Sequence, residues 1–390
     1  MIRVAFPLIG GPGWTGGYNY LLNLLRVVQM QVPGRITPVV LFGPDAPVED
    51  HAPFVAIPGV EIVVDPAFGA AGKSRRLLEA LLLGLDSQAA RVFRTHGIDV
   101  VFEAAQFYGW RLPIASVAWI PDFQHRHLTH LFPLPARLKR TVGFTAQVFS
   151  GRHMMLSSED ARIDCEKFHP ATRGRTAVIR FAIPRDRPVD AAEARAAANR
   201  HSLPEIFFFL PNQFWLHKNH AVVVDALALL KNRGRSVVVA ASGNQIDPRD
   251  PGHFKILQAR AEALGVSALF RPLGPVPYAD IALLMRASVA LINPSLFEGW
   301  STTVEEAKAS GTPMVLSDLR VHREQTGGEA ILFSPRSAED LAARLEEFVP
   351  ASPAERAKAA EDAVVHARER VETFATAFVD LIERAARPGR

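Results

Sequence analysis

Apolar and polar positions follow two patterns along the 390 residues. Short apolar runs, typical of buried strands, are separated by stretches in which apolar residues recur every three or four positions, as in helices. In the stretch 17–31, for example, Leu21, Leu25 and Val28 fall on one helical face. Strands that alternate with helices indicate parallel βαβ units, so the pattern predicts an α/β fold.

The first half of the chain forms one series of such units. Its expected strands are residues 2–8, 36–42, 60–64, 98–102, 114–120, 153–156 and 177–182. Its clearest helical patterns are residues 17–31, 74–95 and 135–149. The proline-rich segment 183–188 breaks the alternation and is expected to be an interdomain linker.

A second series follows the linker. Its expected strands are residues 206–210, 237–241, 268–271, 289–292, 313–316 and 330–333. Its expected helices are residues 220–233, 254–264, 278–286, 303–310 and 338–348, with one or two more between 353 and 386. The length also favours two domains. We therefore expect one Rossmann-like domain over residues 1–182 and a second over residues 183–365.

Composition is that of an ordinary soluble protein, with 48% hydrophobic and 22% charged residues. The single Cys165 excludes an intrachain disulfide and a multi-cysteine zinc site. The first residues do not resemble a signal peptide, and no apolar run approaches the ~18 to 20 residues of a membrane span. We therefore expect a cytoplasmic protein.

The net charge of +4 is unevenly spread. Residues 123–158 contain five Lys or Arg and no Asp or Glu. This segment is either a solvated basic face or a surface for anionic lipid headgroups or a phosphorylated acceptor, centred on residues 137–152. Nucleic acid is not an expected partner, because no recognition motif accompanies the charge.

Candidate chemistry is densest in residues 293–307, NPSLFEGWSTTVEEA. A buried strand, a glycine-containing loop and a helix are expected here in succession. Ligands of parallel sheets bind at such strand ends, and the helix N-terminus attracts anions. Glu298 lies in the loop and Glu306 in the helix. Pairs three residues apart, such as Thr303 and Glu306, also fit a capping box, in which the glutamate only satisfies the backbone.

The segment resembles the nucleotide-sugar site of retaining GT-B glycosyltransferases of family 4, the glycosyl transferases group 1. Their pattern is Glu-Gly-aromatic-Gly-apolar-x-x-x-Glu-Ala. The residues that match it are Glu298, Gly299, Trp300, Glu306 and Ala307, while Ser301 and Thr302 replace the usual Gly and Leu. The resemblance implies two Rossmann-like domains that face a central cleft. It also implies that a last helix, about residues 366–386, packs back on the first domain.

The resemblance implies a role for each residue of this motif. Glu306 would hold the ribose hydroxyls and Glu298 the donor-sugar hydroxyls. Backbone N–H groups from Gly299 to Thr302, including Trp300 and Ser301, would stabilise the diphosphate. The anomeric configuration would be retained without a metal, and no cofactor is expected besides the nucleotide sugar, which is a substrate.

A second motif, residues 211–220, follows the first expected strand of the C-terminal domain. Family members carry Gly-Arg-x-x-x-x-Lys-Gly here, and the two cations clamp the donor pyrophosphate. Lys218 matches the lysine, Asn219 replaces the glycine, and Gln213 replaces the arginine. One cation is thus missing from the leaving-group site. His217, His220 or helix ends are the expected substitutes; otherwise activity would be weak.

A third motif, residues 119–127, follows an N-terminal strand. Family members place a His-Asp-like loop here, against the transferred sugar or the acceptor. Asp122 matches the acid, Pro121 occupies the histidine position, and His125 or His127 could substitute. Asp122 could instead cap a helix. No third ligand accompanies the His-x-His pair, so we do not expect a metal site.

The glycine-rich loop at residues 10–19 permits two interpretations. Its Gly11, Gly13 and Gly16 satisfy the dinucleotide fingerprint, which favours an NAD-type oxidoreductase. The acid expected at the end of the next strand is missing, however. The glycosyltransferase interpretation, in which Gly16 and Gly17 open a helix that faces the cleft, is therefore preferred. A tight turn without a ligand remains the structural alternative.

Smaller signals complete the expected donor pocket. Asn244 follows the second strand of the C-terminal domain, and Arg271 and Leu273 lie where family backbone groups meet the base. Both places are also ordinary turn sequences.

The function expected from these motifs is transfer of a sugar from a nucleotide-diphosphate sugar to a hydroxyl of a glycan, lipid-linked or protein acceptor, in cell-surface polysaccharide or glycoconjugate synthesis. Lys218, Glu298, Asp122 and His125 are the expected catalytic residues. An NAD-type oxidoreductase, a GT-B sugar-nucleotide epimerase and a non-catalytic sugar-binding relic are the alternatives.

Overall fold

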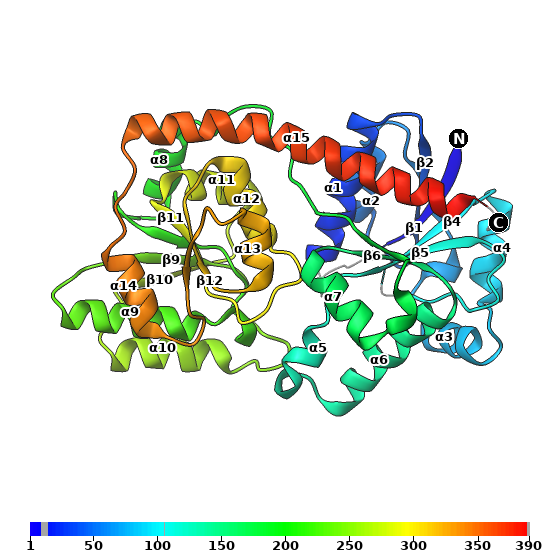
Figure 1. Cartoon of the computed structure of the whole chain (residues 1–390), viewed down its shortest axis with the longest axis horizontal. Coiled ribbons are helices and arrows are strands. Elements are labelled where there is room, and N and C mark those ends of the chain that lie inside the picture. Colours follow the sequence, from blue (N-terminus) through cyan, green and yellow to red (C-terminus); the bar gives the residue numbers. More distant parts are fainter. Residues whose placement is uncertain (9–14, 105, 388–390) are drawn as a thin grey trace. The chain divides into compact units, whose positions relative to one another are not determined.

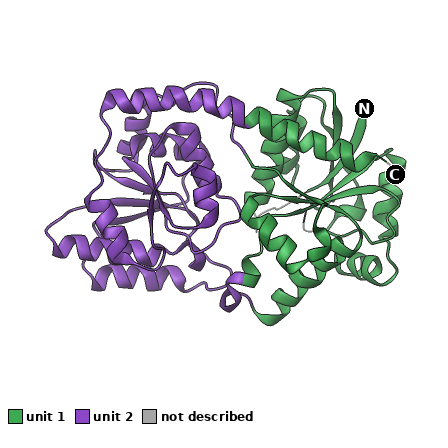
Figure 2. Ribbon diagram, viewed as in Figure 1, with its two compact units in different colours: residues 1–126, 133–181, 371–390 green, residues 127–132, 182–370 purple. Residues whose placement is uncertain are grey.

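The computed structural model describes residues 1–8, 15–104 and 106–387. The chain divides into two compact units (Figure 2). Unit 1 comprises residues 1–126 and 133–181 and the chain from Val371 onward, and unit 2 comprises residues 127–132 and 182–370. Each unit contains one parallel sheet with helices on both faces (Figure 1), as the alternating pattern predicts.

Unit 1 contains a seven-stranded sheet with the order β3-β2-β1-β4-β5-β6-β7. Its strands are β1 (Ile2–Pro7), β2 (Ile36–Phe42), β3 (Glu61–Val64), β4 (Val100–Ala104), β5 (Ala115–Ile120), β6 (His153–Leu156) and β7 (Thr176–Val178). Its α-helices are α1 (Thr15–Gln31), α2 (Val48–Val55), α3 (Lys73–Leu82), α4 (Ser87–Thr95), α5 (Gln124–His127), whose last residue belongs to unit 2, α6 (Leu134–Phe149) and α7 (Glu159–Phe168).

The single helical pattern expected over residues 74–95 is two helices, so that expectation was wrong. Gly84, with a φ of 81°, takes a left-handed conformation between α3 and α4. Asp86 then caps α4, since its carboxylate accepts the N–H of Ala89 at 3.0 Å. A glycine followed by a capping residue is a stop-and-start signal that the apolar periodicity concealed.

Aromatic side chains fill one face of the unit 1 sheet. Phe6 of β1 and Phe102 of β4 lie 5.5 Å apart between ring centroids. Phe378, from the last helix α15 (Pro353–Ala386), packs on Phe102 at 5.6 Å. Tyr20 of α1 stacks on Trp119 of β5 at 4.1 Å. Each such ring contributes about 1.5–3 kcal/mol when it is removed from water, so the final residues of α15 are part of this core.

Unit 2 contains a six-stranded sheet with the order β10-β9-β8-β11-β12-β13. Its strands are β8 (Phe208–Leu210), β9 (Val239–Ser242), β10 (Phe270–Gly274), β11 (Ala290–Asn293), β12 (Met314–Ser317) and β13 (Ile331–Phe333). Its α-helices are α8 (Ala191–Arg200), α9 (His220–Asn232), α10 (His253–Ala263), α11 (Tyr278–Ala287), α12 (Thr302–Ser310), α13 (Arg320–Thr326), α14 (Ala338–Glu346) and the first part of α15.

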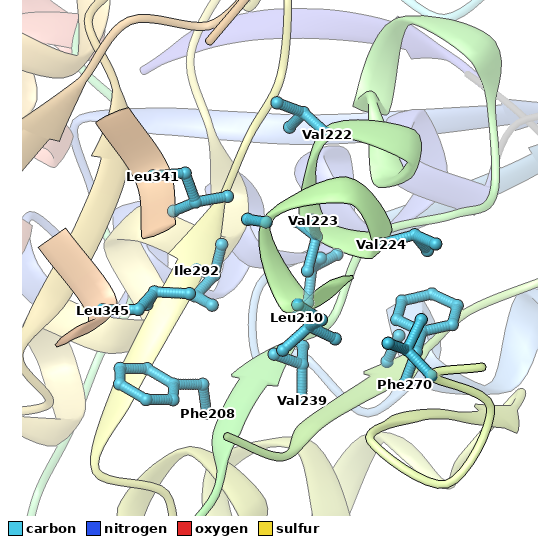
Figure 3. Close-up of a cluster of buried hydrophobic side chains, with 14 of the residues drawn as sticks. Phe208, Leu210, Val222, Val223, Val224, Val239, Phe270, Ile292, Leu341 and Leu345 are labelled. Carbon is cyan, nitrogen blue, oxygen red and sulfur yellow. The ribbon is translucent and has the colours of Figure 1, made fainter. Parts of the chain in front are cut away.

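Two apolar layers hold the unit 2 helices on the sheet. Figure 3 shows one layer, in which Val223 of α9 and Leu341 of α14 pack over Leu210 and Ile292 of the strands. On the other face Phe209 packs with residues of α11 and α12. Because both faces are covered, the polar ends of the strands are the places where this sheet can meet a ligand.

Candidate donor site

The strand order places two loops of unit 2 together. The chain moves outward from β8 through β9 to β10, and then returns to the other side of β8 with β11. Strands β8 and β11 are therefore neighbours whose following loops diverge, which is the topological switch point where doubly wound sheets bind ligands. The loop after β8 carries Lys218 and the loop after β11 carries Glu298.

The buried amide of Asn293, the last residue of β11, fixes the start of its loop. Its Oδ1 accepts the backbone N–H of Ser295 at 3.2 Å and the Nδ2 of Asn212, in the β8 loop, at 3.2 Å. Its own Nδ2 donates to the hydroxyl of Ser301 at 2.9 Å. One side chain thus joins both loops and the start of α12. The sequence interpretation missed Asn293, although a polar residue at the end of an apolar strand is a recognisable signal.

Lys218 and Glu298 meet at the switch point. Lys218 Nζ donates to Glu298 Oε1 at 2.6 Å, and the side chains are only 14% and 9% exposed. The hydroxyl of Ser295 also lies 2.6 Å from the same oxygen. Burial raises the pKa of Glu298, but Lys218, His322 and Ser295 lower it to about 2, so the residue is a carboxylate at neutral pH.

The residue that replaces the usual glycine preserves the local backbone. Asn219 has a φ of 56° and ψ of 39°, a left-handed conformation that asparagine tolerates better than most residues. Its Nδ2 donates to the carbonyls of Pro294 at 3.1 Å and Pro335 at 2.8 Å. Asn219 therefore supplies the turn that a glycine would give and also holds the β11 loop in place.

The residue that replaces the usual arginine has a similar role. Gln213 Oε1 accepts the backbone N–H of Asn244 at 2.6 Å, and the carbonyl of Asn244 accepts the N–H of Phe214 at 3.0 Å. The side chain thus ties the loop after β8 to the loop after β9. Gln213 and Asn244 thus contact each other, although Gln213 brings no charge, and their role in nucleotide binding stays a prediction.

Neither nearby histidine supplies the missing charge, so the helix ends remain as the expected substitute, with weak activity as the alternative. Burial, followed by the charges of neighbouring groups, lowers the pKa of His217 to about 3, and the same holds for His220. His217 Nδ1 instead accepts a hydrogen bond from Arg249, at 3.0 Å, in its neutral form. Arg249 itself pairs with the buried Asp247 at 3.0 Å. At neutral pH, Lys218 is therefore the charged residue of the 211–220 motif.

Helix α12 does not begin with a capping box formed by Thr302 and Glu305 or by Thr303 and Glu306. Its N-cap is Ser301, and the carboxylate of Glu305 accepts from Lys308 at 3.0 Å and from Gln325 at 3.1 Å. Gln325 also holds both backbone groups of Ser301, each at 3.0 Å. Glu305 and the previously unsuspected Gln325 thus brace the start of the helix. Gly299 and Trp300 are half-buried before it, and Thr302 is exposed at its first position.

Glu306 is therefore available for a role other than capping. It is half-buried on α12. Burial raises its pKa to about 7, against the opposing effects of a hydrogen bond with Tyr278 and the charge of Arg185. A carboxylate that titrates near neutrality, next to a phenol and a guanidinium, can accept hydroxyl donors when it is ionised.

The side chains of two residues of the expected donor pocket, Arg271 and Leu273, point elsewhere, so the expected contact of their backbone groups with the base stays a prediction. Arg271 donates to the carbonyls of Ser202 at 2.9 Å and Ala268 at 3.1 Å, both in segments that precede strands. Its side chain is thus directed to the amino ends of the strands, whereas the site lies at their carboxyl ends. Leu273 packs against the apolar layer that contains Phe209. A strand position alone did not reveal these directions.

The remaining expected site residues belong to unit 1. Asp122 accepts the N–H of Gln124 at 2.8 Å and so begins the short helix α5. His125 is buried between Phe123 and Phe144. Burial and nearby arginines lower its pKa to about 4, so it is neutral. Gly16 and Gly17 lie in the first turn of α1, while Gly11 and Gly13 of the dinucleotide fingerprint lie outside the described residues.

The described residues contain neither a candidate metal site nor a candidate membrane-spanning helix. No group of three or more His, Cys, Asp or Glu side chains there could hold a metal ion. Nor does the described chain contain a helix with the length and apolar character needed to cross a membrane.

Residues 192–370 match the family model "Glycosyl transferases group 1". Among curated proteins, the chain is similar to the D-inositol 3-phosphate glycosyltransferases of Mycobacterium bovis and Mycobacterium tuberculosis, with 29% identity over 178 residues. That alignment covers 45% of this chain but only 36% of the relatives, so it spans about a third of their length.

Solved structures match nearly the whole chain. HepE from Anabaena, in complex with UDP and glucose, has a TM-score of 0.69 at 17% identity and covers 98% of this chain and 100% of its own. A glycosyltransferase from Rickettsia africae has a TM-score of 0.69 at 14% identity, with coverage of 100% and 99%. WaaG, a glycosyltransferase involved in lipopolysaccharide biosynthesis, has a TM-score of 0.66 at 15% identity, with coverage of 98% and 99%. The expected α/β fold, with two Rossmann-like doubly wound domains like those of these GT-B neighbours, is confirmed.

Proposed function

We propose that the protein transfers a sugar from a nucleotide-diphosphate sugar to a hydroxyl acceptor, because residues 192–370 match the family model "Glycosyl transferases group 1". The observation that carries the proposal is the Lys218–Glu298 pair at the switch point between β8 and β11. A cation and a carboxylate are held there, beside the N-terminus of a helix. This is the charge pattern that a sugar diphosphate requires.

The proposed roles divide between the two groups of the pair. Both contacts of Glu298 within the described chain are made by Oε1, so Oε2 is left to accept a hydroxyl of the donor sugar. The Lys218 ammonium has three donors and gives one to Glu298, so two remain for diphosphate oxygens. As the sugar–phosphate bond breaks, charge grows on the diphosphate, and Lys218 and the first N–H groups of α12 would stabilise it.

Glu306 is proposed to bind the ribose. Glu306 lies within helix α12, whereas Glu298 lies in the loop before it. The two carboxylates can therefore contact different parts of a nucleotide sugar, the ribose and the transferred sugar. Its carboxylate would accept the two ribose hydroxyls, beside Tyr278 and Arg185. We propose Asp122 and His125 of unit 1 for contacts to the transferred sugar or the acceptor, with His125 acting as a neutral imidazole. Retention of configuration without a metal ion completes the proposal.

The proposed acceptor is a glycan, lipid-linked or protein hydroxyl in cell-surface polysaccharide or glycoconjugate synthesis. The neighbour WaaG is described as acting in lipopolysaccharide biosynthesis, and the curated relatives as acting on an inositol phosphate. The acid-free segment 123–158 favours an acceptor that is anionic or that is held at an anionic surface.

A thermal-shift panel of UDP, GDP, ADP, dTDP and NAD tests the donor site. UDP is the first candidate, because the neighbour HepE binds it. A nucleotide at about 100 times its Kd stabilises by about 2.7 kcal/mol, which is a readily measured shift. Stabilisation by NAD alone would refute the proposal in favour of an oxidoreductase. Release of a modified sugar without an acceptor would favour an epimerase, and nucleotide binding without any turnover would favour a sugar-binding relic.

Two variants test the division of roles. Glu306→Ala should weaken binding of the nucleotide diphosphate itself. Glu298→Ala should leave the free nucleotide diphosphate bound but slow the transfer, because its partner is the sugar. Equal loss of both properties in both variants contradicts the assignment.

A further inference from the structure

Helix α6 of unit 1 carries an apolar ridge on its outer surface. Four large apolar side chains are exposed, in fractions between 50% and 81%: Leu134, Leu138, Val142 and Phe149. They follow one another at spacings of four, four and seven residues, so they share one face of the helix. The unit 1 core does not need them, because Phe144 and Val148 on another face of α6 already pack into it.

Positive charge surrounds this ridge. Arg137 lies to one side of it by helical spacing and Lys139 to the other, whereas Arg140 falls on the opposite face of the helix. Between residues 123 and 158 no Asp or Glu offsets these charges. Arg152 does not contribute to the surface, since its guanidinium is buried and bonded to Glu103 at 3.0 Å. The basic region expected over residues 137–152 is therefore narrower and consists of α6 itself.

We propose that α6 docks unit 1 on an anionic lipid bilayer, with the apolar ridge inserted among the headgroups and the flanking cations on lipid phosphates. A helix with an apolar face bordered by Lys and Arg is the form in which chains lie in a membrane interface. The charge selects the occupant, because an anionic surface attracts Arg137 and Lys139, whereas a second copy of this basic helix would repel them.

The docking surface deepens the proposed function and rests on it for its purpose, since it would bring the enzyme to a lipid-linked acceptor. Lipid binding is nevertheless measured without any sugar transfer. If the protein binds nucleotide but not vesicles, only this inference is refuted. If it binds vesicles but not nucleotide, only the proposed function is refuted.

Co-sedimentation of the full chain with vesicles tests the inference. Vesicles of phosphatidylcholine alone are compared with vesicles that also contain phosphatidylglycerol. We expect the mixed vesicles to bind the protein, with an affinity that falls as salt rises. The double change Leu138→Glu and Val142→Glu should weaken binding at least about tenfold, and Lys139→Ala about fivefold, since one surface cation contributes about 1 kcal/mol.

Ile256→Glu on α10 is the matched control, because Ile256 is also a helical residue and is 65% exposed, but belongs to unit 2. Its binding should equal that of the unchanged protein. Phe149→Asp provides a second ridge variant if the double variant does not fold, as judged by its thermal midpoint. Unchanged binding of a folded ridge variant overturns the inference. So does a concentration-dependent dimer that the same changes abolish, which would assign the ridge to a second copy.

Discussion

Replacement of Lys218 by methionine should destabilise unit 2 and not only impair donor binding. The change removes an ammonium 2.6 Å from Glu298 Oε1 and leaves the carboxylate without its counter-charge. A pKa lowered from 4.5 to about 2 corresponds to about 3 kcal/mol of stabilisation of the ionised form. Loss of one partner from a buried pair costs about 3–5 kcal/mol in other proteins, which agrees.

The pH dependence follows from the sign of the shift. Because the folded pKa of Glu298 lies below its ordinary value, the stabilisation is complete above about pH 4.5 and is lost as the pH falls through about 2. Measurements at neutral pH therefore record the whole effect. In Lys218→Met the pKa of Glu298 should rise, because burial is then opposed only by weaker neighbours.

Urea unfolding of a double-mutant cycle measures the coupling. Lys218→Met, Glu298→Gln and the double variant are compared at neutral pH, and hydrogen exchange in peptides from residues 192–370 assigns the transition to unit 2. We expect the free energy of unfolding of the double variant to be at least about 2 kcal/mol higher than the sum of the two single effects would give. Arg260→Met is the control, since its pair with Asp225 is exposed and should contribute only about 0–1 kcal/mol. Single effects that add within about 0.5 kcal/mol would refute the coupling.

Three further predictions concern other groups. Affinity for UDP should rise up to about tenfold between pH 6 and 8, because the ribose hydroxyls require an ionised Glu306, whose pKa is about 7. Calorimetry should show weaker, pH-independent binding of UDP to Glu306→Gln. Arg152→Met should destabilise unit 1 by about 3–5 kcal/mol in urea unfolding, since it leaves Glu103 buried and unpaired; a loss below 1 kcal/mol would contradict this. Gln213→Arg should break the hydrogen bond to the Asn244 N–H yet strengthen UDP binding, and weaker binding would show that loop geometry matters more than the added cation.

The periodic pattern was sufficient for the fold because both sheets are parallel and covered on both faces. Short continuous apolar runs that end after about four residues, such as residues 289–292, are then typical of strands, whereas the run 221–224 continues into the longer apolar pattern of helix α9. The boundaries of helices were less predictable where a local signal interrupted the helical periodicity of apolar residues. Gly84 and Asp86 are such a signal between α3 and α4. Periodicity cannot record a single glycine with positive φ, so that break was missed.

The site was only partly predictable, for a different reason. Motif spacing placed Lys218 and Glu298 in loops that strand order brings together. It could not show that Arg271 points toward the amino ends of the strands, because side-chain direction depends on which carbonyls lie nearby. The supporting residues Asn293 and Gln325 were missed as well, since their roles arise from contacts between segments far apart in the sequence.

The two departures from the family pattern in residues 211–220 keep the local backbone contacts, and only Gln213 removes a charge. Asn219 keeps the left-handed turn of a glycine, and Gln213 keeps the β8 and β9 loops joined. The neutral His217 and His220 restore none of the lost charge. The proposed leaving group therefore relies on Lys218, whose charge is partly neutralised by Glu298, and on the N-terminus of α12, which contributes about 0.3–1 kcal/mol. In the proposed complex the Lys218–Glu298 pair stays intact, since Lys218 has two further N–H donors for the diphosphate and Glu298 Oε2 remains for a sugar hydroxyl. The ion pair would then hold the two donor-binding groups in a fixed relation to each other.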